Sequence, residues 1–233
     1  TKIILGASGA GKSISLKILL GFLKPDAGAV WVKGRRVDEL SEVEMMAVRA
    51  SFGMVFQEGA LFDSLTVREN VGYRLYEESD LPLDDVDERV REVLGFIGLS
   101  EFEGRMPAEL SGGQRRRVAI ARAMASKPEI LLYDEATTGL DPITALTVDD
   151  EIIKLRDLEG VSSIVVTHQL RDAFYVATNM AVRDGRSVRI VPAPPEKVRQ
   201  AEFLMLRNGL IVFEGDAEAL RRTGDDYLRS FLS

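Results

Sequence analysis

The stretch Gly6-Ala7-Ser8-Gly9-Ala10-Gly11-Lys12-Ser13 carries the strongest structural signal in the sequence. It follows the apolar run 3–5 and precedes an apolar-periodic segment at 14–23, so a strand, a glycine loop and a helix are predicted in that order. Glycines let backbone N–H groups curl around an anion, and a helix start adds unpaired N–H groups and a positive dipole end. Lys12 would reach the β- and γ-phosphates, and the Ser13 hydroxyl would hold Mg²⁺. A nucleoside triphosphate is the predicted ligand, and a glycine turn without a ligand is the alternative.

The composition excludes several classes of protein. The chain has 233 residues and no cysteine, so a full core is available, disulfides are excluded and a reducing compartment fits. A formal net charge of −7 argues against a general nucleic-acid binder. No run approaches the roughly 20 apolar residues that span a bilayer, so we expect a soluble protein or one attached to a membrane through a partner. Because Thr1 lies only five residues before the glycine loop, we also expect a further N-terminal piece.

Two acids follow another buried strand. The run Ile130-Leu131-Leu132-Tyr133 is continuous and apolar, which is typical of a central parallel strand, and it ends in Asp134 and Glu135. Burying such charges is costly without compensation, and Mg²⁺ held by Asp134, with Ser13 opposite, would supply it. Glu135 is placed to accept a proton from a water that attacks the γ-phosphate.

Gln57 and His168 follow two further strands, predicted at 51–56 and 163–167. Ligand groups in open α/β sheets lie at the carboxyl ends of the strands. From the residues alone, Gln57 is most simply a loop amide. His168 is the only histidine in the chain and is either a structural residue or a phosphate contact.

The segment Leu110-Ser111-Gly112-Gly113-Gln114 has two interpretations. Ser111 would cap the helix predicted at 115–125, and two glycines at a helix start would let a second anion approach the bare N–H groups. An ordinary serine cap with a hinge is the simpler interpretation from spacing alone. We interpret the following Arg115-Arg116-Arg117 as the solvated side of the helix, with binding of phosphate or lipid headgroups as the alternative.

The other segments have helical and hairpin patterns. The sequence from 66 to 110 is charged, with apolar residues at helical spacing. Trp31 lies in a short alternating strand, predicted at 29–33, and is expected in the core, with stacking on a base as the alternative. Asn208-Gly209 between two apolar runs predicts a hairpin, and helices are predicted after it at 217–222 and 227–232.

The ordered motifs resemble those of the ATP-binding cassette (ABC) ATPases. They are GASGAGKS at 6–13, Gln57, LSGGQ at 110–114, ILLYDE at 130–135, Gly139-Leu140-Asp141 and His168, and the resemblance runs to about Ala177. It implies one nucleotide-binding domain of the α/β class: a P-loop NTPase core with a mostly parallel sheet, a helical subdomain and a C-terminal part, with the family's N-terminal antiparallel strands missing. The implied ranges are 1–65 and 111–183 for the core, 66–110 for the ABC α-helical subdomain, and 184–233 for the C-terminal hairpin and helices.

The resemblance implies ATP and Mg²⁺ as ligands and assigns roles to single residues. The loop from Gly6 to Ser13, with the backbone N–H of Ile14, would bind phosphate. Ser13, Gln57 and Asp134 would hold Mg²⁺, and Gln57 would also contact the attacking water. Glu135 would be the catalytic base, and His168 would contact the γ-phosphate.

The resemblance also implies partners. Two subunits, most simply a homodimer, would enclose two ATP molecules head to tail. Ser111, Gly112 and Gly113, with Gln114 beside them, would clamp the γ-phosphate of the ATP held by the opposing subunit, and Asp141 would lie at the dimer seam. An integral membrane permease would hold the subunit peripherally at the cytoplasmic face of the inner membrane.

A narrower resemblance links residues 57–71, Met106-Pro107 and Thr167-His168 to the ATPases of Mla/Mce-type phospholipid transporters. It implies lipid transport and a Mce-type substrate-binding partner, with an amino-acid or other small-solute importer as the alternative. A soluble cassette protein acting on DNA or ribosomes fits less well, because the chain is acidic and has neither a long coiled coil nor a second cassette, and no nucleic-acid partner is expected. Glu135 and His168 argue against a regulator that never hydrolyses ATP.

Four features depart from the family pattern. The adenine-stacking aromatic residue lies upstream of the phosphate loop in the family, so none is assigned here. Ile14 replaces a common hydroxyl residue, and Ala136 replaces the usual proline after Glu135. Residues 184–202, with their proline cluster, resemble an insertion without an assigned role.

Overall fold

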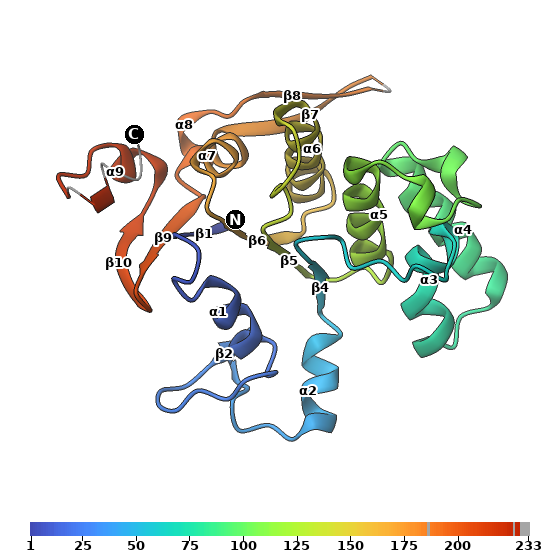
Figure 1. Ribbon diagram of the computed structural model, residues 1–233, viewed down its shortest axis with the longest axis horizontal. Helices are drawn as coiled ribbons and strands as arrows, with labels where there is room; N and C mark the ends of the chain where they lie inside the picture. The colour runs from blue at the N-terminus through green and yellow to red at the C-terminus, as the bar shows by residue number, and fades with distance from the viewer. Residues whose placement is uncertain (186, 226, 229–233) are drawn as a thin grey trace.

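A six-stranded sheet runs through the centre of the computed structural model, which describes residues 1–185, 187–225 and 227–228 (Figure 1). Its strand order is β10-β9-β1-β6-β5-β4, and every neighbouring pair is parallel except β9 and β10. The strands are β1 (Lys2–Leu5), β4 (Phe52–Val55), β5 (Ile130–Asp134), β6 (Ser162–Thr167), β9 (Glu202–Arg207) and β10 (Leu210–Gly215). The prediction of an α/β core with a mostly parallel sheet is confirmed.

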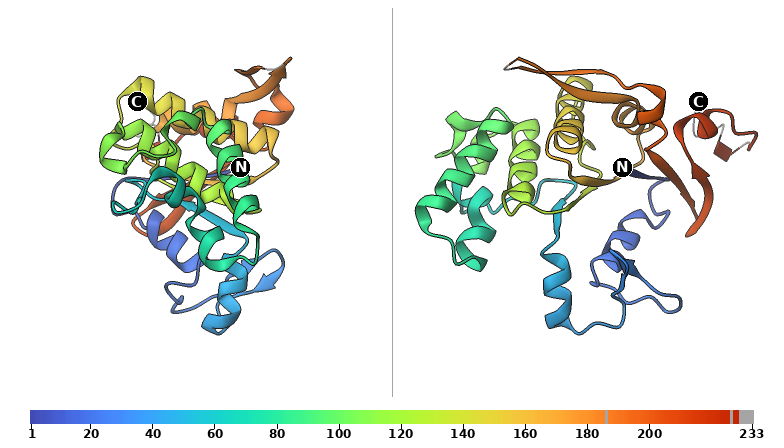
Figure 2. Two further views of the ribbon diagram at one scale, coloured as in Figure 1. Left: turned by 90° about the vertical axis from the view of Figure 1, so that its right-hand side faces the viewer. Right: turned by 180° about the vertical axis from the view of Figure 1, so that it is seen from behind.

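Helices cover both faces of this sheet (Figures 1 and 2). On one face lie α1 (Lys12–Leu19), α2 (Glu42–Arg49) and the ribbon of β2 (Trp31–Val32) and β3 (Arg35–Arg36); on the other lie α6 (Pro142–Leu158) and α7 (Leu170–Thr178). Successive residues of β1 point to opposite faces, so Ile4 joins the apolar cluster under α1 and α2, while Ile3 and Leu5 join the one under α6 and α7. Burial on both faces explains why the strands read as continuous apolar runs.

A helical body lies beside the β4 edge of the sheet (Figure 1). It contains α3 (Val67–Glu78), α4 (Leu83–Phe96), α5 (Gly112–Ala125) and two short 3₁₀ turns, η1 (Ser100–Phe102) and η2 (Pro107–Glu109). The helical spacing predicted for α4 is confirmed, because its buried residues are the predicted ones: Val86, Val90, Val93 and Leu94.

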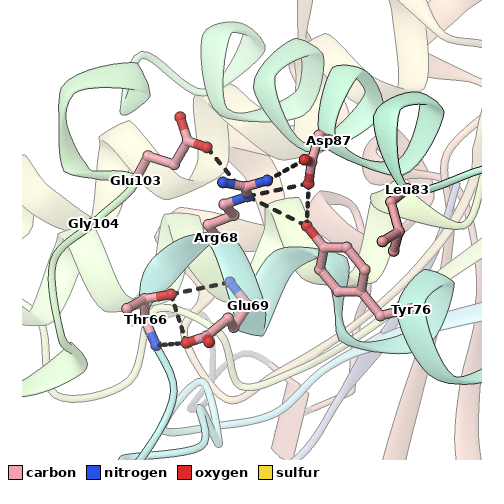
Figure 3. Close-up of a pocket in the computed structure, with 8 residues that line it drawn as sticks. All are labelled: Thr66, Arg68, Glu69, Tyr76, Leu83, Asp87, Glu103 and Gly104. Carbon is pink, nitrogen blue, oxygen red and sulfur yellow. Dashed lines mark hydrogen bonds and ion pairs between the residues drawn. The ribbon is translucent and has the colours of Figure 1, made fainter.

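A hollow of about 730 Å³ lies between α3, α4 and the turn at Glu103 (Figure 3). The guanidinium of Arg68 fills its centre: Nε donates to Asp87 at 3.1 Å and to the Tyr76 hydroxyl at 3.4 Å, and it lies 3.5 Å from Glu103. The charge of Arg68 is therefore already shared among the neighbouring elements. Because the hollow contains none of the residues predicted to bind phosphate or magnesium, we interpret it as an ion-pair cluster that holds this helical body together.

The C-terminal part adds strands to the sheet and a separate ribbon. The predicted hairpin at Asn208-Gly209 is confirmed as β9 and β10, and β9 extends the central sheet by pairing with β1. The apparent insertion contributes to an antiparallel ribbon of β7 (Asn179–Asp184) and β8 (Ser187–Pro192), which runs over α6, and to the short helix α8 (Pro195–Val198). Helix α9 (Ala217–Arg221) follows, and most of the helix predicted at 227–232 lies outside the described residues. Within the described part of the chain, no helix has the length and apolar character to cross a bilayer.

Three details differ from the sequence predictions. Helix α1 ends at Leu19, not at 23, because Gly21 adopts a left-handed φ of 70° and the Phe22 N–H returns to the Lys17 carbonyl. Trp31 is 62% exposed while Val32 is buried, so the strand alternates as predicted but turns the opposite face to the core. Helix α5 begins at Gly112, not at 115, which places both glycines inside its first turn.

Candidate functional site

The loop between β1 and α1 has a backbone that requires its glycines. Gly9 and Gly11 adopt φ values of 81° and 106°, and a Cβ on Gly6 would lie 2.6 Å from the carbonyl oxygen of Leu206. Helix α1 begins after Gly11, which has no side chain to cap it. The first-turn N–H groups therefore have no acceptor within the helix, and together with the positive helix end they form an arrangement that suits an anion.

Lys12 lies inside this loop and is only 4% exposed. Its ammonium donates to the carbonyls of Gly6 at 2.8 Å and Ala7 at 3.1 Å, and lies 3.2 Å from Oε1 of Glu135. The loop thus holds a positive charge at its centre, close to the carboxylate of Glu135, the residue that follows β5.

Ser13 and Asp134 meet directly, because Oγ of Ser13 donates to Oδ1 of Asp134 at 3.0 Å. Burial raises the pKa of Asp134, and the hydrogen bond from Ser13 acts in the opposite direction. A hydroxyl and a carboxylate side by side suit Mg²⁺, which prefers oxygen ligands and takes the rest from phosphate and water. Among the described residues there is no cluster of three or more acidic, histidine or cysteine side chains able to hold a metal.

Glu135 is held from several sides in a left-handed backbone conformation, φ 52°. Its N–H donates to the Val166 carbonyl at 2.8 Å, and its Oε2 accepts from Oγ1 of Thr138 at 3.2 Å and lies 3.1 Å from Nδ1 of His168. Burial works to raise the pKa of Glu135, but the hydrogen bond and charge of Lys12 and the charge of His168 outweigh it and lower the pKa. The carboxylate is therefore ionised at neutral pH.

The structure brings together five of the predicted residues: Lys12, Ser13, Asp134, Glu135 and His168. Gln57 lies at the same carboxyl end of the strands, two residues beyond the end of β4, which neighbours β5. Its side chain is exposed and takes no part in the contacts among these five residues.

The segment from Ser111 to Gln114 forms a second, separate cluster. The Ser111 hydroxyl accepts from the Gln114 N–H, and the Gln114 side chain accepts from the Ser111 N–H, so the two close a capping box at the start of α5. A Cβ on Gly113 would lie 2.2 Å from Cγ2 of Thr144, and Asp141 caps α6 through the N–H groups of residues 143 and 144. Within the described residues, no hydrogen bond or ion pair joins this cluster to the phosphate loop.

Several contacts around this site could not be read from the sequence. Thr138 contacts Glu135, and the Thr137 hydroxyl donates to Asp172 of α7 at 2.6 Å inside the protein.

The interpretation of Arg115, Arg116 and Arg117 as a solvated helix face is wrong. Arg116 is buried, and the arginines at 115, 116 and 117 donate to the carbonyls of Leu110, Thr138 and Ile97. The strongest local signal is the run of three arginines that follows the two glycines and Gln114.

A glycine loop between a parallel strand and a helix, with an acid pair at the end of another central strand, defines a P-loop NTPase. The chain belongs to the ABC transporter family, since the family model described as "ABC transporter" matches residues 1–138. It is therefore a cassette of the ABC ATPase class, whose ligands are ATP and Mg²⁺.

Known proteins are similar over most of the chain. The protein TRIGALACTOSYLDIACYLGLYCEROL 3, chloroplastic, of Arabidopsis thaliana is 45% identical over 183 residues, which cover 71% of this chain and 52% of that protein. The methionine import ATP-binding protein MetN of Symbiobacterium thermophilum is 37% identical over 236 residues, which cover 98% of this chain and 68% of that protein. The chain thus spans about half the length of the first relative.

A solved structure also shares the fold. The dimeric post-hydrolysis state of the ATP-binding cassette MJ0796, bound to ADP and Pi, matches with a TM-score of 0.73 at 29% identity. The match covers 92% of this chain and 84% of that one.

Proposed function

We propose that this chain binds and hydrolyses ATP as one half of a head-to-tail dimer, and that the dimer powers a membrane permease. The observation that carries the proposal is the convergence of Lys12, Ser13, Asp134, Glu135 and His168 at one sheet edge, while the cluster of Ser111–Gln114 and Asp141 lies apart from it.

Each residue of the first cluster has a separate task. The loop N–H groups and Lys12 bind the β- and γ-phosphates, and Ser13, Asp134 and Gln57 would hold Mg²⁺, which would neutralise phosphate charge. Glu135 takes a proton from the attacking water, and its ionised state suits that task. His168, whose Nδ1 lies 3.1 Å from the Glu135 carboxylate, orients it and would contact the γ-phosphate.

The second cluster supports the dimer. Its N–H groups at Gly112 and Gly113 are first-turn groups without an intrahelical acceptor, which makes them a second phosphate-binding helix start. Because Leu140 and Thr144 pack beside them and the Thr144 N–H donates to Asp141, the same face can meet the phosphate loop of a second copy. The dimeric state of the MJ0796 cassette supports this arrangement.

A groove of about 370 Å³ between the end of β4 and α3 is the proposed docking place for a permease helix. Phe56, Phe62 and Tyr73 line it and are each about two-fifths exposed, and the guanidinium of Arg122 lies 5.9 Å from the Phe62 ring centre. Exposed aromatic residues are enriched at protein interfaces. Gln57 follows Phe56 directly, so docking there would reach the nucleotide site. Through such a permease the cassette would be held peripherally at the inner membrane.

For the transported substrate we propose a phospholipid or related lipid, with a Mce-type substrate-binding protein as a further partner. The 45% identity to a relative whose printed name is that of a galactolipid supports a lipid. The second candidate is a small solute such as methionine, which is supported equally well because MetN covers 98% of the chain.

The decisive test uses the cassette co-purified with its permease and reconstituted in vesicles, with phosphate release as the readout. Stimulation by phospholipid cargo supports lipid transport, and stimulation by methionine or another amino acid supports the importer. A purified cassette that binds ATP but releases no phosphate, alone or with its permease, would contradict the proposed function.

A further inference from the structure

Arg116 is a buried cation in the first turns of α5, the helix that begins with the Ser111 capping box. Only 7% of its surface is exposed, and its Nη2 donates to the carbonyl oxygen of Thr138 at 3.0 Å. Burying a guanidinium is costly unless its charge and donors are used. We therefore expect Arg116 to have a function other than keeping the helix soluble.

Thr138 joins Arg116 to the acid at the end of β5. Its N–H donates to the Glu135 carbonyl at 3.1 Å, and its Oγ1 donates to Oε2 of the same residue at 3.2 Å. Residues 135–138 thus form a closed turn, with Glu135 at one end and the acceptor of Arg116 at the other. A displacement of the Thr138 carbonyl would displace the hydroxyl that holds the Glu135 carboxylate.

The guanidinium also lies near the loop that contains Gln57. Burial lowers the pKa of Arg116, and the charge of neighbouring Glu58 opposes this effect. The Nε of Arg116 is buried and has no hydrogen-bond partner within the residues that the structure describes. The Arg116 side chain thus lies between its own helix α5, the turn at 135–138 and the loop after β4.

We propose that Arg116 is a positioning residue for Glu135: by holding the Thr138 carbonyl, it makes the geometry of the base depend on the position of α5. The inference rests on the proposed function and deepens it. In a head-to-tail dimer, the start of α5 binds the nucleotide of the partner, whereas Glu135 acts on the nucleotide of its own protomer. Arg116 therefore links one ATP site of the dimer to the other.

The test compares Arg116→Met with the wild-type chain in steady-state phosphate release with ATP and Mg²⁺. We expect kcat to fall about 10- to 100-fold, the range expected when a catalytic group is misplaced by up to about 1 Å. KM and the affinity for ATP should stay unchanged, because no contact of the phosphate loop is altered. Arg116→Lys, which keeps the charge and a donor, should recover part of the lost kcat.

Arg117→Met is the matched control. Arg117 is the next residue of α5 and also donates to a carbonyl, that of Ile97 at 3.2 Å, but this acceptor lies at the end of α4 and not beside Glu135. Its loss should leave kcat at the wild-type value. Arg116→Gln, which keeps a polar but shorter side chain, replaces Arg116→Met if thermal unfolding shows that the latter does not fold.

A double variant separates positioning from a general loss of structure. In a Glu135→Gln background, Arg116→Met should cause no further loss in single-turnover hydrolysis, because both changes act through one carboxylate. Wild-type kcat in folded Arg116→Met or Arg116→Gln, or a full further loss in the Glu135→Gln background, would overturn the inference. A wild-type chain without hydrolysis would overturn the proposed function itself and this inference with it, so the two failures are distinct.

Discussion

Replacing Glu135 with glutamine should nearly stop hydrolysis while nucleotide binding persists. The Glu135 side chain is 14% exposed, with Oε1 3.2 Å from the Lys12 ammonium and Oε2 3.1 Å from Nδ1 of His168. An amide of the same size can still accept from Thr138 but cannot take a proton from water. Loss of a general base costs roughly 10²–10⁴-fold in rate, which corresponds to about 2.7–5.4 kcal/mol in activation free energy.

The assay combines phosphate release, equilibrium binding of ATP with Mg²⁺, and the molecular mass in solution by light scattering. We expect unchanged binding and accumulation of an ATP-bound dimer, because the step that precedes dimer opening is blocked. Glu129→Gln is the control: this exposed acid next to the start of β5 pairs with Lys33, at the opposite end of the strand from the site, and its loss should not change the rate. Hydrolysis at the parental rate by Glu135→Gln would refute the assignment of the base.

Three further changes test other parts of the site. Lys12→Ala removes the buried ammonium and should weaken ATP binding by about tenfold or more, measured by titration with labelled ATP, since a charge-assisted hydrogen bond contributes about 1.5–3 kcal/mol; unchanged affinity would contradict its role. Gly113→Ala places a Cβ 2.2 Å from Cγ2 of Thr144, so the Thr144 side chain or the helix start must shift; hydrolysis should be lost with monomer ATP binding intact, and normal turnover would count against the second phosphate site. Burial, followed by the charge of Asp172, raises the pKa of Asp149 to about 8. The folded chain therefore holds a proton that the unfolded chain releases, and stability from this group is lost as pH rises from about 4 to 8. Asp149→Asn should raise Tm relative to wild type by several °C at pH 8 and by less at pH 5, because the cost of ionising this buried group is present only in the wild type and grows with pH; an equal change at both pH values would contradict the assignment.

The sequence predicted the phosphate loop and the sheet because both depend on local patterns. Glycines at fixed positions between a strand and a helix leave little choice of backbone, and continuous apolar runs predict strands covered on both faces. Asp134 and Glu135 could be placed at the site for the same reason: they end one of those runs.

Contacts between distant segments were not predictable in this way. Arg116 lies in a run of three arginines, a pattern typical of a solvated helix face, and only the packing of α5 against the turn at 135–138 buries it. Trp31 alternates as a strand residue should, but a ribbon of two-residue strands does not specify which face meets the core. In both cases the local pattern is compatible with two environments, and tertiary packing selects one.

The most direct test of the composite site mixes two impaired variants, Lys12→Ala and Gly113→Ala, at an ATP concentration too low for Lys12→Ala to bind it. In a mixed dimer, the intact phosphate loop of the Gly113→Ala chain faces the intact Ser111–Gln114 segment of the Lys12→Ala chain. Phosphate release should therefore rise above that of either variant alone, to at most about a quarter of the wild-type rate, because half of randomly formed dimers are mixed and each has one complete site of two. A mixture that stays as inactive as its two components, although mixed dimers form, would contradict a site shared between two copies of the chain.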